Sequence, residues 1–329
     1  MITGGAAPMK IIALEEHFIL PSDAGNLPPG AAAGNDREAI VGISSGVGLL
    51  DVGARRLAAM DAAGIDVQVL SLNQPGCQSL FGAEAIAKAR AANDYLAEQV
   101  AEHPGRFIGF AAIPTAEPSA AADELERAVV LLGFKGVTIN GHTEGSFLDD
   151  KQYWVIFERA QSLGVPIYLH PRLPHPSAMK AYFEGYEDLA LAAWGFAMDT
   201  CSHFLRLVFS GVFDRYPKLT VILGHMGEGL PFLLHRANEH TKGAAARRGL
   251  RKTLAEYVTD NLAITLSGNF SNPALVCSVM ALGVSKILFA VDWPYESNLA
   301  AVDFLRQLPL SEQEITQIAH GNAERLLRL

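Results

Sequence analysis

The sequence has few cysteines, no long apolar run and no concentration of charge of either sign. Its three cysteines, Cys77, Cys201 and Cys277, lie far apart without paired spacing, which argues against a disulfide framework and against a thiolate zinc site. We therefore expect a reducing, cytoplasmic compartment. No apolar stretch reaches the roughly 20 residues that a membrane-spanning helix needs, so we expect no membrane partner.

The charge pattern also argues against nucleic acid as a partner. The chain has 26 Lys and Arg against 35 Asp and Glu, and its formal net charge of -9 is spread without long runs. Basic residues cluster only around Arg247, Arg248 and Arg251, which is most simply explained as a solvated helix face. Since neither nucleic acid nor a membrane is expected as a partner, we expect a small molecule.

The length and apolar content predict a large core. Half of the 329 residues are apolar, which suits one α/β barrel as well as two domains. Residues 1–9 are rich in Gly and Ala and too short for a signal peptide, so we predict a disordered tail there. Residues 10–329 have one continuous composition and are expected to form a single domain.

Apolar runs rich in β-branched residues alternate with longer segments of helical spacing. This alternation predicts α/β architecture with parallel strands. The eight expected strands are 10–16, 66–72, 106–113, 134–140, 165–170, 219–225, 262–267 and 286–292. The expected helices are 49–63, 83–103, 118–132, 150–163, a long region 177–216, 229–242 and 272–282.

Eight such repeats predict a (β/α)8 TIM barrel, with a doubly wound sheet carrying an extra lobe as the alternative. Segment 21–48 is rich in Gly, Pro, Asn and Ser and is expected to form a long loop after the first strand. The residues from Ser311 onward are expected to form closing helices at the C-terminus.

Polar side chains follow many of the expected strands, at the barrel end where catalytic groups gather in this fold. Side chains alternate along a strand, so Glu15 and His17 should share one face, whereas Glu16 should point outward and tolerate replacement. The other candidates at strand ends are Asn73, Asn140, His170, His225 and Asp292.

Together these residues predict a metal site. Glu15, His17, His170 and Asp292 form the most economical ligand set, although any one of these histidines alone is more simply a core residue bonded to the backbone. Mixed nitrogen and oxygen ligands favour Zn²⁺ or Mn²⁺ over Cu²⁺ and over Mg²⁺.

Further residues are candidates for contacts to the substrate. Glu228 follows His225 by three residues and could fix its tautomer and charge, or it could simply complement the start of a helix. Arg172 and Arg236 lie near strand ends and could meet an anionic substrate, or form surface ion pairs.

Four ordered segments carry a family resemblance: 13–18 (ALEEHF), 168–172 (YLHPR), 222–228 (ILGHMGE) and 289–296 (FAVDWPYE). They resemble the motifs of amidohydrolase-superfamily decarboxylases, above all the γ-resorcylate and 2,3-dihydroxybenzoate decarboxylases. The resemblance implies one metal held by Glu15, His17, His170 and Asp292, with His225 and Glu228 behind it. It also implies that Arg236 lies near the substrate, and that the chain forms a homodimer or homotetramer.

The resemblance also implies a reaction. Hydrolytic relatives usually have His at the position of Glu15, so a carboxylate there favours non-oxidative, reversible decarboxylation of an ortho-hydroxylated aromatic carboxylate, of the dihydroxybenzoate or salicylate type. Asp292 is the expected proton donor, while Asn73, Arg172 and Arg236 are expected to contact the substrate. A metal-dependent hydrolase or hydratase is the alternative.

The sequence departs from the family pattern at two places near the expected pocket. The loop between Asn140 and Tyr153 is shorter than in the most similar enzymes, and Asn238 stands where an aspartate commonly follows the arginine by two. Both differences bear on which aromatic acid is the substrate.

Overall fold

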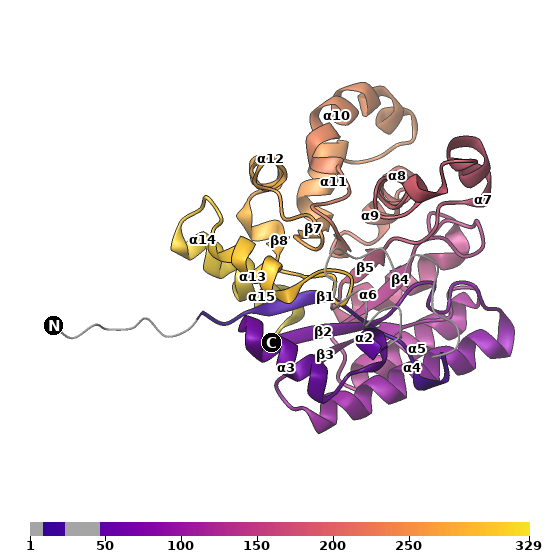
Figure 1. Ribbon diagram of the computed structural model, residues 1–329. Helices are drawn as coiled ribbons and strands as arrows, with labels where there is room; N and C mark the ends of the chain where they lie inside the picture. Colours follow the sequence, from indigo (N-terminus) through magenta and orange to yellow (C-terminus); the bar gives the residue numbers. More distant parts are fainter. Residues whose placement is uncertain (1–8, 24–46) are drawn as a thin grey trace.

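Parallel strands line up in one sheet in the same order as in the chain. The structure is a computed structural model that describes residues 9–23 and 47–329 (Figure 1). Its 8-stranded sheet has the order β1-β2-β3-β4-β5-β6-β7-β8, and every neighbouring pair is parallel. The strands are β1 (Ile12–Phe18), β2 (Val67–Leu72), β3 (Phe107–Ala112), β4 (Gly136–Asn140), β5 (Ile167–His170), β6 (Val221–Leu223), β7 (Leu262–Thr265) and β8 (Ile287–Leu288).

The chain after β8 meets β1 and brings the two edges of the sheet together. Leu14 N donates to Phe289 O at 3.1 Å, and His17 N donates to Trp293 O at 2.8 Å. The sheet therefore curls into a nearly closed barrel, and the predicted (β/α)8 fold is confirmed.

Helices connect the strands and surround them (Figure 1). They are α2 (Val47–Leu50), α3 (Ala54–Ala63), α4 (Gly82–Glu102), α5 (Pro118–Val130), α6 (Trp154–Leu163), α7 (Pro176–Ala178), α8 (Gly195–Ser210), α9 (Val212–Arg215), α10 (Leu230–Arg247), α11 (Leu254–Asn261), α12 (Asn272–Leu282), α13 (Asn298–Arg306), α14 (Glu312–Thr316) and α15 (Asn322–Leu327). Helices α14 and α15 are the closing helices expected after Ser311.

The helix predictions were incomplete in places. The predicted helix 49–63 is two helices, because Asp51 Oδ1 accepts a hydrogen bond from Gly53 N at 2.8 Å and interrupts the regular backbone pattern. The region 177–216 contains α7, short turns, α8 and α9. Helices α11 and α13 were not predicted, although Thr253 and Glu256 form a capping box that marks the start of α11.

The predicted tail and the predicted long loop lie largely outside the residues that the structure describes. The predicted tail 1–9 is described only at Met9, and its remaining residues lie outside the described part of the chain. Of the predicted loop 21–48, the structure describes a 3-10 turn at Pro21–Asp23 and the start of α2, while residues 24–46 lie outside it.

The core has two layers that together fix the barrel mouth. The larger cluster fills the space between strands and helices, and the smaller one contains strand side chains such as Leu14, Phe110, Tyr168 and Ile222. Alternate residues of a strand belong to the two different clusters, because successive side chains point to opposite faces. Polar residues at the strand ends stand above the smaller cluster, and they form the candidate site.

Candidate metal and active site

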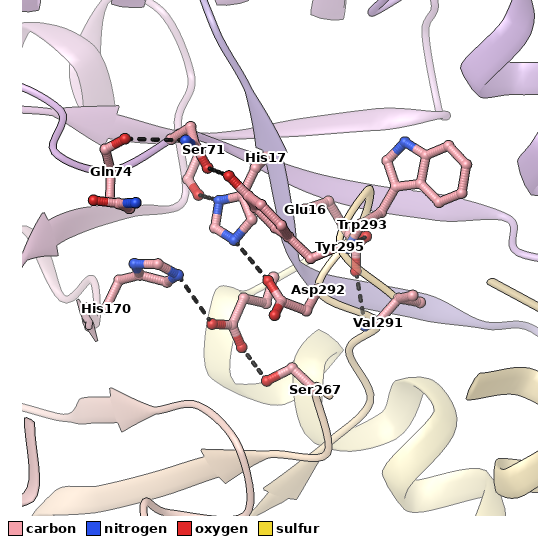
Figure 2. A network of polar contacts seen from close by, with 12 residues as sticks. Glu16, His17, Ser71, Gln74, His170, Ser267, Val291, Asp292, Trp293 and Tyr295 are labelled. Atoms are coloured by element: carbon pink, nitrogen blue, oxygen red, sulfur yellow. Dashed lines mark hydrogen bonds and ion pairs between the residues drawn. The ribbon is translucent and has the colours of Figure 1, made fainter. Parts of the chain in front are cut away.

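Four predicted residues meet at the barrel mouth. Glu15 and His17 come from β1, His170 ends β5, and Asp292 follows β8; each offers one ligand atom, and these atoms all lie within 4.8 Å of one another. His17 Nε2 lies 3.0 Å from Asp292 Oδ1 (Figure 2). His170 Nε2 lies 3.4 Å from Glu15 Oε1. The described residues thus present two imidazoles and two carboxylates to one point.

A local irregularity in β1 directs Glu15 toward this point. The pairing of β1 with β2 shifts register between Ala13 and Glu16, as a β-bulge does. Regular alternation from Ile12 and Leu14, which belong to the smaller core cluster, would turn Glu15 to the opposite face, and the bulge reverses this while Glu15 and His17 still share one face. Glu15 and His17 are both fully buried, with 1% and 0% of their surface exposed.

One carboxylate oxygen of Glu15 is held tightly and the other is left free. Glu15 Oε2 accepts hydrogen bonds from the hydroxyls of Tyr168, Thr265 and Ser267. Glu15 Oε1 is buried and has no hydrogen-bond partner among the described residues. Since a buried carboxylate oxygen is costly to leave without a partner, this atom fits a divalent cation.

The electrostatics agree with a ligand role for His170. Burial, followed by the neighbouring His17, lowers the pKa of His170 well below its ordinary value, so the ring is neutral. A neutral imidazole is the form that binds a metal. Burial raises the pKa of Glu15, while the positive charge of His225 opposes that shift.

Asp292 sits in an unusual backbone conformation. Its φ of 78° lies in the left-handed region, which costs a non-glycine residue about 1–3 kcal/mol and often marks a functional site. Burial alone would raise the pKa of its carboxyl, but hydrogen bonds with His17 and His225 outweigh burial and lower it. Asp292 is therefore ionised in this arrangement.

His225 and Glu228 lie on a tight left-handed turn after β6. The φ values are 49° at His225, 58° at Met226, 74° at Gly227, 54° at Glu228 and 77° at Gly229. The turn places His225 Nδ1 2.7 Å from Glu228 Oε1. The other nitrogen, Nε2, lies 3.5 Å from an oxygen of Asp292.

The charge of His225 follows from these neighbours. Burial lowers its pKa, but the carboxylates of Glu228 and Glu15 raise it more, so the net pKa is well above the ordinary value. This raised pKa favours the imidazolium form of a ring whose Nε2 faces Asp292. The interpretation of Glu228 as a residue that merely complements a helix start is weaker, because its carboxylate points to His225 and α10 begins only at Leu230.

A pocket opens beside these residues and encloses about 610 Å³, part of it open to solvent. It has a polar side next to the site and an apolar side that suits an aromatic ring. Its lining includes His170, His225, Asp292, Gln74, Tyr295, Glu296, Pro171, Leu191, Ala192 and Phe196.

Comparison with known proteins places the chain among relatives of known chemistry. Residues 52–329 match the family model described as amidohydrolase. The chain belongs to the amidohydrolase family. This amidohydrolase is 41% identical over 290 residues to γ-resorcylate decarboxylase from Polaromonas sp. strain JS666, covering 85% of this chain and 89% of the relative.

Two solved structures resemble it over nearly their whole length. One is 2,6-dihydroxybenzoate decarboxylase in complex with 2,6-dihydroxybenzoate, with a TM-score of 0.88, 38% identity, and coverage of 98% of this chain and 100% of that chain. The other is a dihydroxybenzoic acid decarboxylase from Polaromonas sp. JS666 with bound manganese and the inhibitor 2-nitroresorcinol, with a TM-score of 0.88, 39% identity and 97% coverage of each chain. The sequence-based assignment of the amidohydrolase as a decarboxylase is thereby confirmed.

Several lining residues of this amidohydrolase were not predicted. Tyr295 and Glu296 belong to the segment 289–296 that carries the resemblance. Because they follow Asp292 so closely in the sequence, they could have been predicted to line the pocket. Gln74 directly follows Asn73. Leu191 lies in a stretch of short turns, and Phe196 lies in the first turn of α8; neither pattern gives a signal of a pocket wall.

Asn73 and Arg172 are near the mouth of the amidohydrolase but do not line the pocket. Asn73 Oδ1 accepts a hydrogen bond from the hydroxyl of Tyr295 at 2.9 Å, so it acts on the pocket through that ring. Arg172 donates to His142 O at 2.8 Å and to Ser79 Oγ at 3.1 Å, and thus ties two loops together.

Arg236 is exposed on α10 and does not line the pocket of its own chain. Asn238, two residues later, accepts a hydrogen bond from Ala255 N at 3.0 Å. That contact joins α10 to the start of α11, so Asn238 serves a structural purpose here.

Glu16 was expected to point outward and to tolerate replacement; it does point out of the strand, but its surroundings do not favour that tolerance. A side chain that points out of a barrel strand meets the surrounding layer rather than water, and Glu16 is 0% exposed. Its carboxylate accepts hydrogen bonds from Val291 N and Trp293 N, and Gln68 Nε2 lies 3.4 Å away.

Proposed function

We propose that this amidohydrolase removes CO2 from an aromatic carboxylate that carries a hydroxyl ortho to the carboxylate. The observation that carries the proposal is the site around Glu15, where one oxygen is held by three hydroxyls and the other is free beside His170. Together with an adjoining pocket that has an apolar wall, this site suits a flat, anionic, aromatic molecule. Its decarboxylase relatives, which act on dihydroxybenzoates, support the substrate class.

The residues present fit one divalent metal ion per subunit, and we propose Mn²⁺ or Zn²⁺ rather than Mg²⁺. Glu15, His17, His170 and Asp292 would hold the ion, which is consistent with the mixed nitrogen and oxygen set and with the free oxygen of Glu15. When bound, the ion supplies positive charge that orients an aromatic carboxylate and lowers the pKa of the neighbouring phenol.

Asp292 relays the proton that the reaction needs from the substrate's own hydroxyl to its ring. An ionised Asp292 first takes the proton of the ortho hydroxyl, and then gives it to the ring carbon that bears the carboxylate. The bond between that carbon and the carboxylate carbon then breaks, its electron pair restores the aromatic ring, and CO2 leaves. Proton transfer by a positioned acid typically contributes about 10²–10⁴ in rate.

His225 and Glu228 provide fixed charge opposite the substrate. The imidazolium of His225 faces the site and can hold an anionic oxygen of the substrate, while Glu228 keeps the ring oriented. Neither residue needs to exchange a proton with the ring. Their role is therefore binding and charge balance.

We further propose that the active form is a homodimer or homotetramer. Phe232 and Leu233 at the start of α10 are 82% and 50% exposed, and Met280 on the adjacent α12 is 84% exposed. Such a patch suits a second copy of the chain. A role for Arg236 at the substrate fits this arrangement, because Arg236 is exposed on the same helix and does not reach its own pocket.

The remaining expectations are consistent with this proposal. The three cysteines are free, which suits the cytoplasmic compartment that we propose. Among the described helices, none has the length and apolar character that crossing a membrane requires. The hydrolase or hydratase alternative is not favoured, because the relatives described above are decarboxylases.

A panel of aromatic acids tests the proposed substrate class. The Mn²⁺-loaded protein is incubated with salicylate and with 2,3- and 2,6-dihydroxybenzoate, and CO2 release is compared with that from 3- and 4-hydroxybenzoate. We expect CO2 only from acids with an ortho hydroxyl. Equal rates from acids without it would refute the proposed route of the proton through Asp292.

A further inference from the structure

Three successive backbone N–H groups around Asp292 point at two adjacent residues of β1. Val291 N donates to Glu16 Oε1 at 3.0 Å, and Trp293 N donates to Glu16 Oε2 at 3.1 Å. Between them, Asp292 N donates to the backbone oxygen of Glu15 at 2.9 Å. Figure 2 shows Glu16 beside Val291 and Trp293, with Asp292 close to His17.

This convergence requires a special backbone at Asp292. In an extended chain, successive N–H groups point to opposite sides, so three in a row cannot meet one neighbouring strand. The left-handed φ of 78° at Asp292 turns the chain so that all three N–H groups reach β1. The outer two, on Val291 and Trp293, bind the two oxygens of the Glu16 side chain, and the middle one binds the backbone oxygen of Glu15.

The Glu16 side chain is buried among polar partners. Glu16 is 0% exposed and also lies next to the amide of Gln68, whose Oε1 is 3.3 Å from Arg56 Nη1. Arg56 is itself buried and donates to the backbone oxygen of His17. A chain of polar contacts thus runs from Asp292 through Glu16 back to β1.

We propose that Glu16 is a positioning residue that holds the backbone of Asp292 in its left-handed conformation and so sets the Asp292 carboxylate against His17. This inference rests on the proposed role of Asp292 as a metal ligand. The N–H groups of both residues that flank Asp292 depend on one side chain, so we expect a change at Glu16 to displace Asp292 more than any other site residue.

Barrel closure does not by itself require this carboxylate. Leu14 N donates to Phe289 O at 3.1 Å and His17 N donates to Trp293 O at 2.8 Å, and these backbone contacts join β1 to the chain after β8 without a side chain. The distinct contribution of Glu16 is therefore local to residues 291–293.

A double-mutant cycle on metal affinity tests the proposal without substrate. The metal-stripped protein is titrated with Mn²⁺, and the Kd is measured for the wild type, Glu16→Gln, Asp292→Ala and the double variant. Glutamine has the shape of glutamate but only one acceptor oxygen, so one flanking N–H loses its partner. Supporting residues of metal ligands typically contribute about 10–100-fold to affinity, and we expect a loss of that size from Glu16→Gln alone.

The effect of Glu16→Gln on the Mn²⁺ Kd should depend on the presence of Asp292. In the Asp292→Ala background, Glu16→Gln should change the Kd by less than about twofold, because the residue through which it acts is gone. An equal loss in both backgrounds, or no loss in either, would overturn the proposal. If wild-type protein binds no Mn²⁺, the proposed ligand set fails, and this inference fails with it.

The matched control is Glu124→Gln. Glu124 is also a buried carboxylate, but it lies on α5, where it accepts hydrogen bonds from Asn93 and Arg127 outside the site. We expect this change to leave the Mn²⁺ Kd as it is. Should Glu16→Gln not fold by circular dichroism, Glu16→Asp takes its place in the cycle, since its shorter side chain reaches only one N–H, and the same outcomes decide.

Discussion

His225 Nδ1 and Glu228 Oε1 lie 2.7 Å apart, and this contact leaves His225 Nε2 to face Asp292 and Glu15. Both residues have left-handed backbones, with φ values of 49° and 54°. The turn therefore fixes the direction of the ring, and the carboxylate fixes its charge.

Replacing Glu228 by Gln should lower kcat by about 10², the lower end of what a positioned charged group contributes. The amide keeps the size of the side chain but removes the negative charge that keeps His225 protonated. Metal content should be unchanged, because Glu228 is not one of the four residues at the proposed ligand site. Steady-state kinetics with metal analysis check this, and Glu239→Gln on the exposed face of α10 is the control.

Replacing Asp292 by Asn should lower kcat by at least about 10² to 10⁴, because an amide cannot take the phenolic proton and return it to the ring. The fold should survive, since Asn has nearly the same shape. The rate is measured on protein whose metal content and melting temperature are known. A metal-loaded variant with the wild-type rate would show that another group is the acid.

Replacing Gly224 by Ala should weaken Mn²⁺ binding by about tenfold or more through displacement of Glu15. The added methyl group would lie 2.9 Å from each carboxylate oxygen of Glu15 and 3.1 Å from the hydroxyl of Tyr168. The Glu15 carboxylate cannot easily move away from the methyl group, because three hydroxyl groups bind it.

Titration of the metal-stripped variant with Mn²⁺ measures this effect, and Gly243→Ala on α10 is its control. A methyl group at Gly243 meets only the mobile end of Arg247, at 3.3 Å. We expect unchanged Mn²⁺ affinity there, with stability raised by up to about 1 kcal/mol. Normal Mn²⁺ binding by Gly224→Ala would contradict the ligand role of Glu15.

The stability of the protein should fall as the pH drops below about 6.5, partly because of His203. Burial lowers the pKa of His203 to about 3, and its Nε2 accepts a hydrogen bond from Leu148 N at 2.8 Å. Between the folded pKa and the ordinary unfolded value, only the unfolded state binds the proton. The stabilisation is therefore complete above the unfolded pKa and is lost as the pH falls toward the folded pKa.

At pH 5, the contribution of His203 should be about 2 kcal/mol smaller than at pH 7.5. His203→Gln keeps an acceptor for Leu148 N but cannot be protonated, so its unfolding free energy should change less between these two pH values. Urea unfolding of both proteins measures the difference. Identical pH dependence would mean that His203 is not buried as a neutral ring.

Many of the strand ends could be read from the sequence, because a polar residue follows an apolar run there. That pattern led to Glu15, His17, His170 and Asp292, which the structure brings together. The spacing between strands is long enough for crossover helices, so the barrel order followed as well.

Other parts of the site depend on contacts that no local pattern records. Tyr168, Thr265 and Ser267 hold Glu15 from two different strands or their ends, and only the closed barrel brings them together. The burial of Glu16 could not be foreseen for a related reason. Alternation gives the face of a strand, but whether that face meets water or other protein is a property of the fold.

The most direct test of the proposed function is the product balance with 2,6-dihydroxybenzoate. Protein loaded with Mn²⁺ is incubated with this acid without oxygen or any organic cofactor, and CO2 and resorcinol are both quantified. We predict that both form in equal amounts, and that metal-stripped protein forms neither. Loss of the acid without CO2, or CO2 release that requires oxygen, would contradict non-oxidative decarboxylation at this site.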